Sequence, residues 1–360
     1  MRILYITYVD FNRATSGSGV RPGKMYRAFL QEGHQVKLLT GSQERTRREE
    51  RRSDVADISA WLDENRPEIC YIESPGQPIL WREDRALIRK IHAMGIPIGY
   101  FYRDFYWRFP DLYPRRKDPA GRLKDLWLDH LQRQTDALLN CADIVYFPSR
   151  GAAGYFSYRD MRALPPAGEE RDFESRPEPN VCIYVGGLSG GYGGETLLRA
   201  FELLNRGEVC YPLILCCREK ERDAIPADLR NAPWLEIRHT SGDGLAPLYA
   251  RASLAVLPIR RTAYTDIAVN VKFFEYLSYG LPIACTDAAA VAELVEKNGV
   301  GLTGGDSPEA IAETVRAMLS DPERLERWRE KAFRCVKEEN LWIHRVRQVV
   351  RELGEKGEGR

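Results

Sequence analysis

Short apolar runs alternate with longer amphipathic segments along most of the chain. The apolar runs are rich in β-branched and aromatic residues, which is typical of buried strands. In the first half these runs are Ile3–Thr7, Gln35–Thr40, Ile69–Glu73, Ile96–Tyr102 and Ile144–Pro148. The segments with a helical period are Pro22–Glu32, Asp54–Asn65, Glu83–Met94 and Leu123–Asn140. Strands that alternate with helices in this way predict a parallel sheet with helices on both faces.

The alternation is interrupted between Pro165 and Pro179, where four prolines and a cluster of charged residues predict a linker. A second set of strands is then expected at Val181–Val185, Leu213–Cys217, Leu235–His239, Leu254–Pro258 and Pro282–Thr286. The helices that accompany them are expected at Glu195–Asn205, Leu245–Ala250, Val271–Tyr279, Ala289–Lys297, Pro308–Leu319, Pro322–Glu339 and Ile343–Gly354. The sequence therefore predicts an α/β protein with two Rossmann-like, doubly wound domains and a ligand-binding cleft between them.

The expected domain boundaries follow from these patterns. We predict an N-terminal domain over residues 1–165, a linker over 166–179, a C-terminal domain over 180–340 and a terminal helix within 341–360. The polar residues after Gly354 are expected to fray, because they offer no apolar face to bury.

The composition is typical of a soluble globular protein, with 44% hydrophobic and 29% charged residues. Lys and Arg number 53 against 52 Asp and Glu, so the overall charge gives no reason to expect nucleic-acid binding. The eight cysteines show no Cys-x-x-Cys spacing and the five histidines are scattered, so neither disulfides nor a metal site is predicted. No apolar stretch reaches the roughly 20 residues of a membrane span. A cytoplasmic location is therefore expected.

Two glycine-rich loops each follow the first strand of an expected domain. They are Thr15–Gly19, with Pro22 as the expected first residue of the next helix, and Val185–Glu195. Glycine lets the backbone approach a ligand, and a helix N-terminus offers free N–H groups to a phosphate. The candidate donor-binding residues on these loops are Gly17, Ser18, Gly19, Gly186, Gly187, Gly190 and Gly191. Both loops are also compatible with ordinary strand-to-helix turns.

The segment from Thr265 to Ile283 has the most informative pattern. Asn270 is expected to cap a short helix that ends at Gly280. Lys272 and Glu275 are three residues apart and so lie on one face of this helix, near its start. At the end of a strand such a pair can hold a diphosphate and a ribose. The alternative is an ordinary solvated ion pair.

An aromatic segment, Tyr100–Phe109, ends the fourth expected strand. Its Arg103 and Asp104 are candidates to orient reacting groups, and Tyr106 and Trp107 to stack on an acceptor sugar. A buried strand followed by an apolar lid is the alternative.

Two basic clusters, Arg45–Arg52 and Arg115–Lys117, complete the candidate features. Such runs are usually solvated faces. A contact with a membrane surface that presents a lipid-linked acceptor is the other interpretation.

In order and spacing, these motifs are similar to those of the retaining GT-B glycosyltransferases of family 4. The resemblance rests on the segments Gly17–Gly19, Glu32–Val36, Ala142–Ser149, Tyr184–Leu188, Leu245–Pro258, Thr265–Ile283 and Leu341–Trp342. It implies transfer of a sugar from a nucleotide diphosphate sugar to a glycan or lipid-linked acceptor, in polysaccharide or glycoconjugate synthesis. It further implies retention of configuration, no cofactor beyond the donor, no metal (no Asp-x-Asp occurs), and a terminal helix that crosses back to the first domain.

The resemblance also implies roles for individual residues in donor binding and catalysis. Glu275 matches a glutamate that binds the donor ribose, and Asp104 matches the aspartate of a His-Asp pair. Ile267 stands where the family has another glutamate, so the neighbouring Asp266 is expected to contact the donor sugar instead.

The chain departs from the family at the phosphate loop as well. Gly187 stands where the family has Arg, and Tyr192 stands roughly where it has Lys. Stabilisation of the leaving diphosphate is therefore expected from Lys272, loop N–H groups and either Arg260 or Arg261. Catalysis is assigned to Asp104, Lys272 and Glu275, donor binding also to Asp266 and Asn270, and acceptor binding to Arg103, Tyr106 and Trp107.

Two alternative functions stay open from the sequence. A sugar-nucleotide epimerase of the same fold would need acid and base side chains beside the sugar, and we find none. A non-catalytic scaffold derived from a transferase is the other alternative, because the departures from the family remove charged groups.

Overall fold

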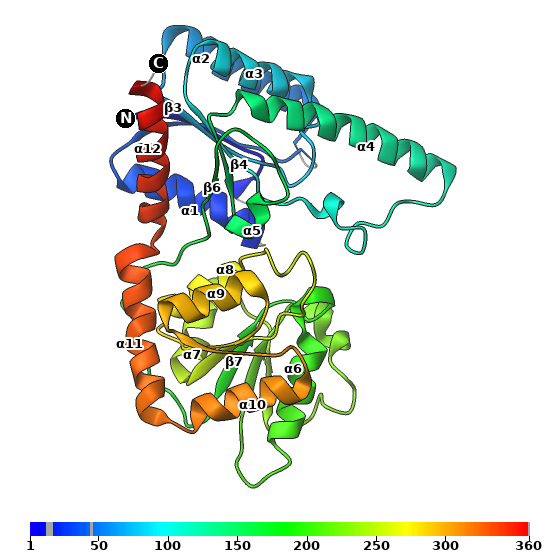
Figure 1. Cartoon of the computed structure of the whole chain (residues 1–360), viewed down its shortest axis with the longest axis vertical. Coiled ribbons are helices and arrows are strands. Elements are labelled where there is room, and N and C mark those ends of the chain that lie inside the picture. Colours follow the sequence, from blue (N-terminus) through cyan, green and yellow to red (C-terminus); the bar gives the residue numbers. More distant parts are fainter. Residues whose placement is uncertain (12–16, 44–45, 359–360) are drawn as a thin grey trace. The chain divides into compact units, whose positions relative to one another are not determined.

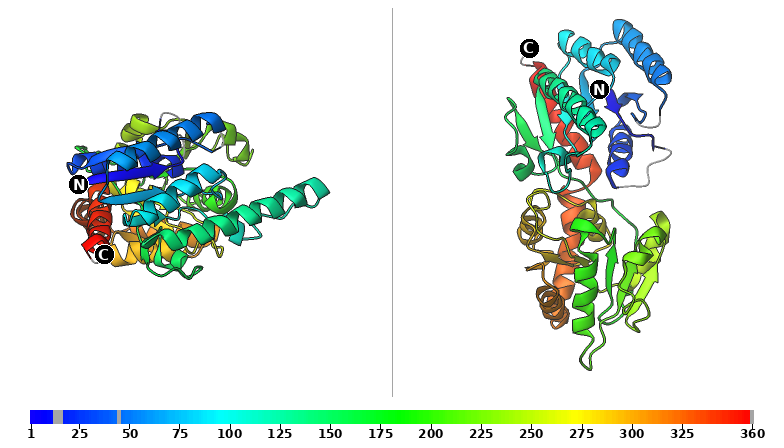
Figure 2. Two further views of the ribbon diagram at one scale, coloured as in Figure 1. Left: turned by 90° about the horizontal axis from the view of Figure 1, so that it is seen from above. Right: turned by 90° about the vertical axis from the view of Figure 1, so that its right-hand side faces the viewer.

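The computed structural model describes residues 1–11, 17–43 and 46–358 (Figure 1). The chain divides into two compact units, Met1–Pro165 together with Trp342–Arg360, and Pro166–Leu341. Each unit is built on a six-stranded sheet in which every pair of neighbouring strands is parallel. Helices cover these sheets (Figures 1 and 2), which confirms the predicted α/β class with two doubly wound sheets.

In the N-terminal unit the strand order is β2-β1-β3-β4-β5-β6. The strands are β1 Arg2–Thr7, β2 Gln35–Leu39, β3 Ile69–Glu73, β4 Ile98–Phe101, β5 Ile144–Phe147 and β6 Met161–Ala163. The helices are α1 Gly17–Gln31, α2 Arg48–Glu64, α3 Arg82–Ala93, α4 Pro119–Leu138, α5 Arg150–Ala153 and α12 Trp342–Glu358. All residues of β3, β4 and β5 are buried, as expected of strands covered on both faces.

In the C-terminal unit the strand order is β12-β11-β10-β7-β8-β9. The strands are β7 Cys182–Val185, β8 Leu213–Cys216, β9 Leu235–Arg238, β10 Leu254–Leu257, β11 Ile283–Thr286 and β12 Gly301–Gly304. The helices are α6 Gly194–Leu204, α7 Ala246–Arg251, α8 Val271–Ser278, α9 Ala289–Asn298, α10 Pro308–Leu319 and α11 Pro322–Glu339. The central strands β7, β8, β10 and β11 are fully buried.

The starts of two helices differ from the prediction. Helix α1 begins at Gly17, so Pro22 lies inside the helix and is not its first residue. Because Pro22 has no N–H, one carbonyl in the first turn of α1 lacks its helical hydrogen-bond donor. The helix loses no other backbone hydrogen bond to Pro22, so the destabilisation is small. Helix α2 begins at Arg48, upstream of the predicted Asp54, because Arg51 faces inward and forms a buried ion pair with Asp84 at 2.7 Å. Because Arg51 is charged, the apolar pattern of the sequence did not mark it as an inward-facing position of the helix.

Two edge strands and the end of the chain also differ from the prediction. The sequence analysis missed β6, which has only three residues, and β12, which begins and ends with glycine. Both are short edge strands with weak strand propensity. The polar tail expected to fray continues α12 as far as Glu358.

Helix α12 belongs to the N-terminal unit although it follows the C-terminal unit in sequence. Val346, Val349 and Leu353 on this helix are fully buried. Leu353 packs so tightly on β4 that a Cβ atom on Gly99 would lie 2.9 Å from the Leu353 Cδ1. Figure 1 shows α12 beside α1, and Arg347 pairs with Glu32 at 2.6 Å just after α1. The last helix therefore completes the first core.

Leu353→Ala should lower the free energy of unfolding by about 2–5 kcal/mol, because it leaves a cavity between α12 and the sheet. The matched control is Leu30→Ala, at a position 45% exposed on α1, which should cost less than about 1 kcal/mol. Urea unfolding followed by circular dichroism measures both. Equal effects of the two substitutions would contradict the placement of α12 in the N-terminal core.

Candidate functional site

The strand order of the C-terminal sheet reverses between the neighbours β7 and β10. Loops that leave the carboxyl ends of strands at such a point diverge, and ligands of doubly wound sheets bind there. The loop after β7 carries Gly186–Gly193, and the chain after β10 runs through residues 258–270 into α8. The donor-site residues predicted for this domain all lie on these segments, so the fold brings them to one edge of the sheet.

The glycine loop after β7 is fitted closely to the end of β10. Gly193 has a positive φ of 69° and caps α6, and a Cβ atom there would lie 1.7 Å from the carbonyl oxygen of Pro258. The N–H of Arg260 donates to the carbonyl of Gly191 at 3.0 Å. Only glycine fits position 193, and the fit fixes the start of α6 beside the loop that follows β10.

Helix α8 carries the predicted Lys–Glu pair. The side chain of Asn270 accepts the Lys272 N–H at 2.9 Å, which confirms the predicted helix cap. Lys272 Nζ donates to Glu275 Oε2 at 2.8 Å. Both side chains are about a quarter exposed, at 25% and 24%. They stay accessible to a ligand, unlike a buried structural pair.

Tyr249 is a residue of this site that sequence reasoning missed. Its hydroxyl donates to Glu275 Oε1 at 2.8 Å from a fully buried position on α7. Burial and the charge of Glu275 raise the pKa of Tyr249 well above its ordinary value, so the hydroxyl keeps its proton. Both carboxylate oxygens of Glu275 are thus oriented before any ligand binds. No short motif signals this contact, because Tyr249 and Glu275 are 26 residues apart.

Helix α8 is anchored to the end of β7, which is itself joined to the end of β8. The Tyr276 hydroxyl accepts the N–H of Val185 at 2.9 Å, and the N–H of Gly186 donates to the carbonyl of Cys216 at 3.0 Å. Burial raises the pKa of the Cys216 thiol, and the charges of Lys272 and Glu275 act on the same thiol. The Lys–Glu pair is therefore adjacent to the strand from which the glycine loop departs.

Asp266 is occupied by structural contacts. Arg261 Nε and Nη2 donate to its two carboxylate oxygens at 3.2 Å each, and the N–H of Ala289 donates to Oδ1 at 3.1 Å, at the start of α9. Burial raises the pKa of Asp266, but the hydrogen bonds from Arg261 and Ala289 outweigh it and the net shift is downward. Contact of Asp266 with a donor sugar stays a prediction, and α9 already uses this carboxylate.

The two candidate arginines differ in their surroundings. Arg261 is held by Asp266 and by Asp287, at 3.4 Å. Arg260 is exposed, and its backbone N–H contacts the glycine loop. Arg260 is therefore the better placed of the two to approach a phosphate.

The structure explains part of the departure from the family pattern. A Cβ atom on Gly187 would lie 3.0 Å from the ring of Tyr192, so this ring fills the space beside position 187. Tyr192 itself is 53% exposed. Ile267 is buried, as an apolar side chain requires. The changes at 187 and 192 are thus coupled in space.

In the N-terminal unit, the predicted pair Arg103 and Asp104 follows β4. Arg103 Nε donates to Asp104 Oδ2 at 3.0 Å, and the N–H of Arg103 donates to the Ser74 hydroxyl at 2.9 Å. A Cβ atom on Gly76 would lie 2.9 Å from Arg103 Nη2. The pair therefore packs against the loop that follows β3, at the carboxyl edge of the N-terminal sheet.

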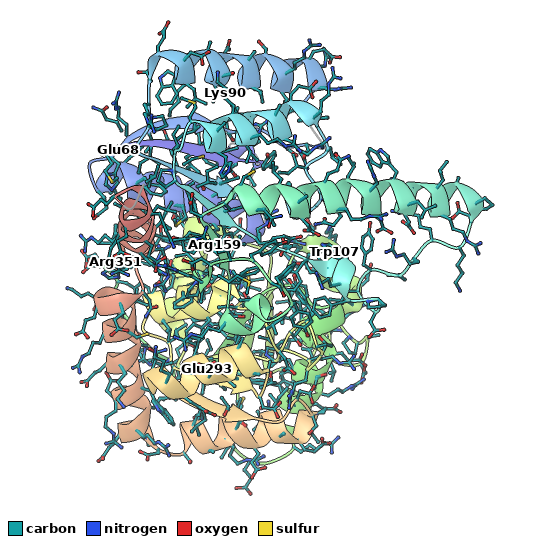
Figure 3. The ribbon with its side chains drawn as sticks, turned by 45° about the horizontal axis from the view of Figure 1, so that its top comes forward. Glu68, Lys90, Trp107, Arg159, Glu293 and Arg351 are labelled. Carbon is teal, nitrogen blue, oxygen red and sulfur yellow. The ribbon has the colours of Figure 1, made fainter. Side chains whose placement is uncertain are left out.

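The remaining residues predicted for this unit lie on two segments. Gly17, Ser18 and Gly19 open α1, and the Thr15 and Ser16 that precede them lie outside the described residues. Tyr106 and Trp107 form a single 3-10 turn between β4 and α4, where Figure 3 labels Trp107. Tyr106 is exposed, and Arg108 stacks on the Trp107 ring at 4.9 Å.

Glu73 is a second residue that the sequence analysis overlooked. It ends β3, is fully buried, and accepts hydrogen bonds from Arg21 Nε at 3.3 Å and from the Tyr71 hydroxyl at 3.1 Å. Burial raises the pKa of Glu73 against the opposing charges of Arg21 and Arg103. A glutamate at the end of an otherwise apolar strand is the only signal that the sequence offers for it.

Residues 1–11, 17–43 and 46–358 contain neither a metal-binding cluster nor a helix able to span a membrane. Within these ranges no three His, Cys, Asp or Glu side chains are grouped to hold a metal ion. In the same part of the chain no helix combines the length and the apolar character needed to cross a bilayer.

Comparisons with known proteins agree with this geometry. Residues 179–321 match the family model described as glycosyl transferases group 1. Sucrose-phosphate synthase from Thermosynechococcus elongatus is similar over 100% of both chains, with 14% identity and a TM-score of 0.70. The Anabaena protein HepE, solved with UDP, is similar over 99% of this chain and 100% of its own, with 13% identity and a TM-score of 0.67.

A third similar structure is WaaG, a glycosyltransferase involved in lipopolysaccharide biosynthesis, with 15% identity, a TM-score of 0.61, and coverage of 97% of this chain and 98% of its own. No curated protein sequence matches the chain. The fold is that of the GT-B glycosyltransferases. With a group 1 glycosyltransferase domain in its C-terminal unit, the chain is a glycosyltransferase.

Tyr249→Phe should lower the free energy of unfolding by about 1–2 kcal/mol, because it removes a hydrogen bond to a partly exposed carboxylate. Tyr192→Phe is the control, since it removes an exposed hydroxyl and should change little. Chemical denaturation of both variants gives the comparison. A Tyr249→Phe variant as stable as the parent would show that this hydrogen bond does not hold Glu275.

Proposed function

We propose that the chain transfers a sugar from a nucleoside diphosphate sugar, bound by the C-terminal unit, to a glycan or lipid-linked acceptor. The observation that carries the proposal is the Tyr249–Glu275–Lys272 chain of hydrogen bonds beside the glycine loop, at the switch point of the sheet. The structures of HepE and of an α-glucosyltransferase in complex with UDP support a nucleoside diphosphate as the ligand class.

Glu275 is suited to the ribose of the donor. Each of its oxygens has one protein donor and keeps a further lone pair, and the side chain is a quarter exposed. Two neighbouring ribose hydroxyls can donate to such a carboxylate. Because Tyr249 and Lys272 already fix its orientation, little side-chain entropy is lost on binding.

Lys272 is suited to the diphosphate. An ammonium group has three N–H donors, so Lys272 can keep Glu275 and still donate to a phosphate oxygen. When the donor bond breaks, negative charge grows on the diphosphate, and donors already in place stabilise it. The N–H groups at the start of α6 and the nearby Arg260 are the other donors that we assign to this role.

We assign the acceptor side to the N-terminal unit. The Asp104 carboxylate, oriented by Arg103, would hold the acceptor hydroxyl or the donor sugar, and Tyr106 and Trp107 would contact the acceptor.

A leaving phosphate oxygen would take the acceptor proton, with retention of configuration. Nuclear magnetic resonance of the product anomer checks this assignment, and an inverted product would contradict it.

We further propose that transfer needs neither a metal ion nor a cofactor. The cationic side chains and loop N–H groups around the diphosphate supply the charge stabilisation that a metal would otherwise provide. Activity that disappears on addition of a chelator and returns with a divalent cation would contradict this part of the proposal.

We also propose a cytoplasmic protein in peripheral contact with the inner face of the cell membrane, acting in polysaccharide or glycoconjugate synthesis. The support is a surface of exposed apolar and basic side chains on α4 and the loop before it. Cell fractionation checks the location, and a protein recovered only outside the cell would contradict it.

Lys272→Ala should reduce transfer at least about a hundredfold, because it removes a preorganised positive charge at the leaving group. Lys297→Ala, on the exposed side of α9, is the matched control and should keep full activity. The measurement is nucleotide release from a panel of UDP, GDP, TDP and ADP sugars, with circular dichroism to confirm folding. Near-normal turnover by Lys272→Ala would refute the role of this residue. If the parent shows no turnover with any donor and a glycan or lipid-linked acceptor, a scaffold function would be favoured.

A further inference from the structure

Large exposed apolar side chains are concentrated in one short part of the N-terminal unit. More than half of those in the described residues lie between Tyr106 and Trp127. Within this span the most exposed are Leu123 at 70%, Leu126 at 62% and Trp127 at 51%, followed by Leu112 at 44%. Scattered single exposures are normal, but a contiguous group marks an interaction surface.

The three most exposed members of this group, Leu123, Leu126 and Trp127, lie on the half of α4 that leaves the body of its unit. Figures 1 and 2 show the N-terminal half of α4 extending past the sheet and the other helices of the N-terminal unit. Leu131 and Leu138 in the other half are buried. Leu123, Leu126 and Trp127 are spaced by three and four residues, so they share one face of the exposed half.

The loop before α4 is folded onto the helix by ion pairs. Arg115 pairs with Asp129 at 3.0 Å, and Arg116 pairs with Asp125, whose carboxylate also accepts the Arg116 N–H at 2.9 Å. Asp118 caps the helix by accepting the Gly121 N–H at 2.7 Å. These contacts tie residues 115–118 of the loop to the first turns of the helix. They also engage the three acidic residues Asp118, Asp125 and Asp129.

The exposed charges beside the apolar side chains of α4 are mostly positive, with Asp111 as an exposed acidic residue before Leu112. Lys117, Arg122 and Lys124 are exposed between the apolar side chains. We call the segment Leu112–Trp127 the docking segment. It carries five Lys and Arg against two Asp, although the whole chain is almost neutral. Apolar and aromatic side chains interleaved with cations match an anionic lipid surface, where rings and alkyl groups enter the headgroup region and cations meet phosphates.

We propose that the docking segment binds the surface of an anionic lipid bilayer, with Leu123, Leu126 and Trp127 entering the interface. The choice of a bilayer rests on the proposed transfer to a lipid-linked acceptor. A second copy of the chain fits less well, because a two-fold contact through this surface would bring the same mostly positive patch of both copies together. The other basic cluster fits less well too, because Arg51 is buried against Asp84 and Arg48 pairs with Glu83 at 3.3 Å.

Co-sedimentation with phosphatidylcholine vesicles, with and without phosphatidylglycerol, tests the proposal on the full chain. The parent should sediment with the anionic vesicles. Substituting Leu123, Leu126 and Trp127 together by Ser should weaken this binding at least about tenfold. Reversing Lys117, Arg122 and Lys124 to Glu should remove the preference for anionic lipid, with about a fivefold loss for each cation removed.

The controls are Leu30→Ser and Val209→Ser, at exposed apolar positions outside the docking segment, and the double variant of Arg47→Glu, just before α2, with Arg52→Glu on α2. All three should bind vesicles like the parent. Thermal melts verify that each variant is folded. Loss of binding only in the α2 variant would move the contact to that helix and overturn the proposal.

Two further results would overturn the proposal. One is equal sedimentation of the parent and the Ser triple variant. The other is a dimer, seen by light scattering, that this triple variant dissolves, because the apolar face would then bind a second copy. No nucleotide sugar is present in the vesicle assay. Failure to bind lipid is therefore distinguishable from failure to transfer sugar to a water-soluble acceptor.

Discussion

The close approach of the glycine loop to the end of β10 is the constraint on which the donor site depends. Position 193 has no room for a side chain, because its Cβ atom would collide with the carbonyl of Pro258. The same loop is held to the end of β10 by a hydrogen bond from the Arg260 N–H to the carbonyl of Gly191. This fit places the start of α6 next to the chain that leads into α8. Tyr276 anchors α8 to β7 at Val185. The groups that we propose as donors to a diphosphate and as the acceptor for a ribose therefore meet at one edge of one sheet.

Within this frame, the site is arranged around a single carboxylate. Glu275 is oriented by a buried neutral donor, Tyr249, on one oxygen and by a charged donor, Lys272, on the other. Because Lys272 and Glu275 balance each other's charge, the unliganded site is close to neutral. In the proposed complex, Lys272 and Arg260 would both interact with the negative charge of the ligand phosphate. Gly187 and Tyr192 carry no charge at the positions where the family resemblance implies cations, so the proposed function assigns more of the charge stabilisation to fixed N–H groups.

Much of the fold could be predicted because it follows from local pattern. The buried strands are continuous apolar runs, and the cap at Asn270 is a short-range signal. The strands β6 and β12 could not be predicted, because short edge strands with glycine carry little pattern. The site was predicted only in part. Lys272 and Glu275 are neighbours on one helix. Tyr249, however, contacts Glu275 from another helix, 26 residues earlier in the chain, and Asp266 contacts the start of α9, 23 residues later. Such contacts depend on tertiary packing, which a single sequence does not state.

The central claim is that the site around Glu275 binds a nucleoside diphosphate. Isothermal titration of the parent, Glu275→Ala and Glu293→Ala with UDP, GDP, TDP and ADP tests it most directly. Glu293 is an exposed glutamate of the same unit, labelled in Figure 3. The account predicts that at least one nucleotide binds the parent and Glu293→Ala equally, and binds Glu275→Ala at least about tenfold more weakly. Binding that is the same in all three proteins, or absent from the parent for every nucleotide, would contradict it.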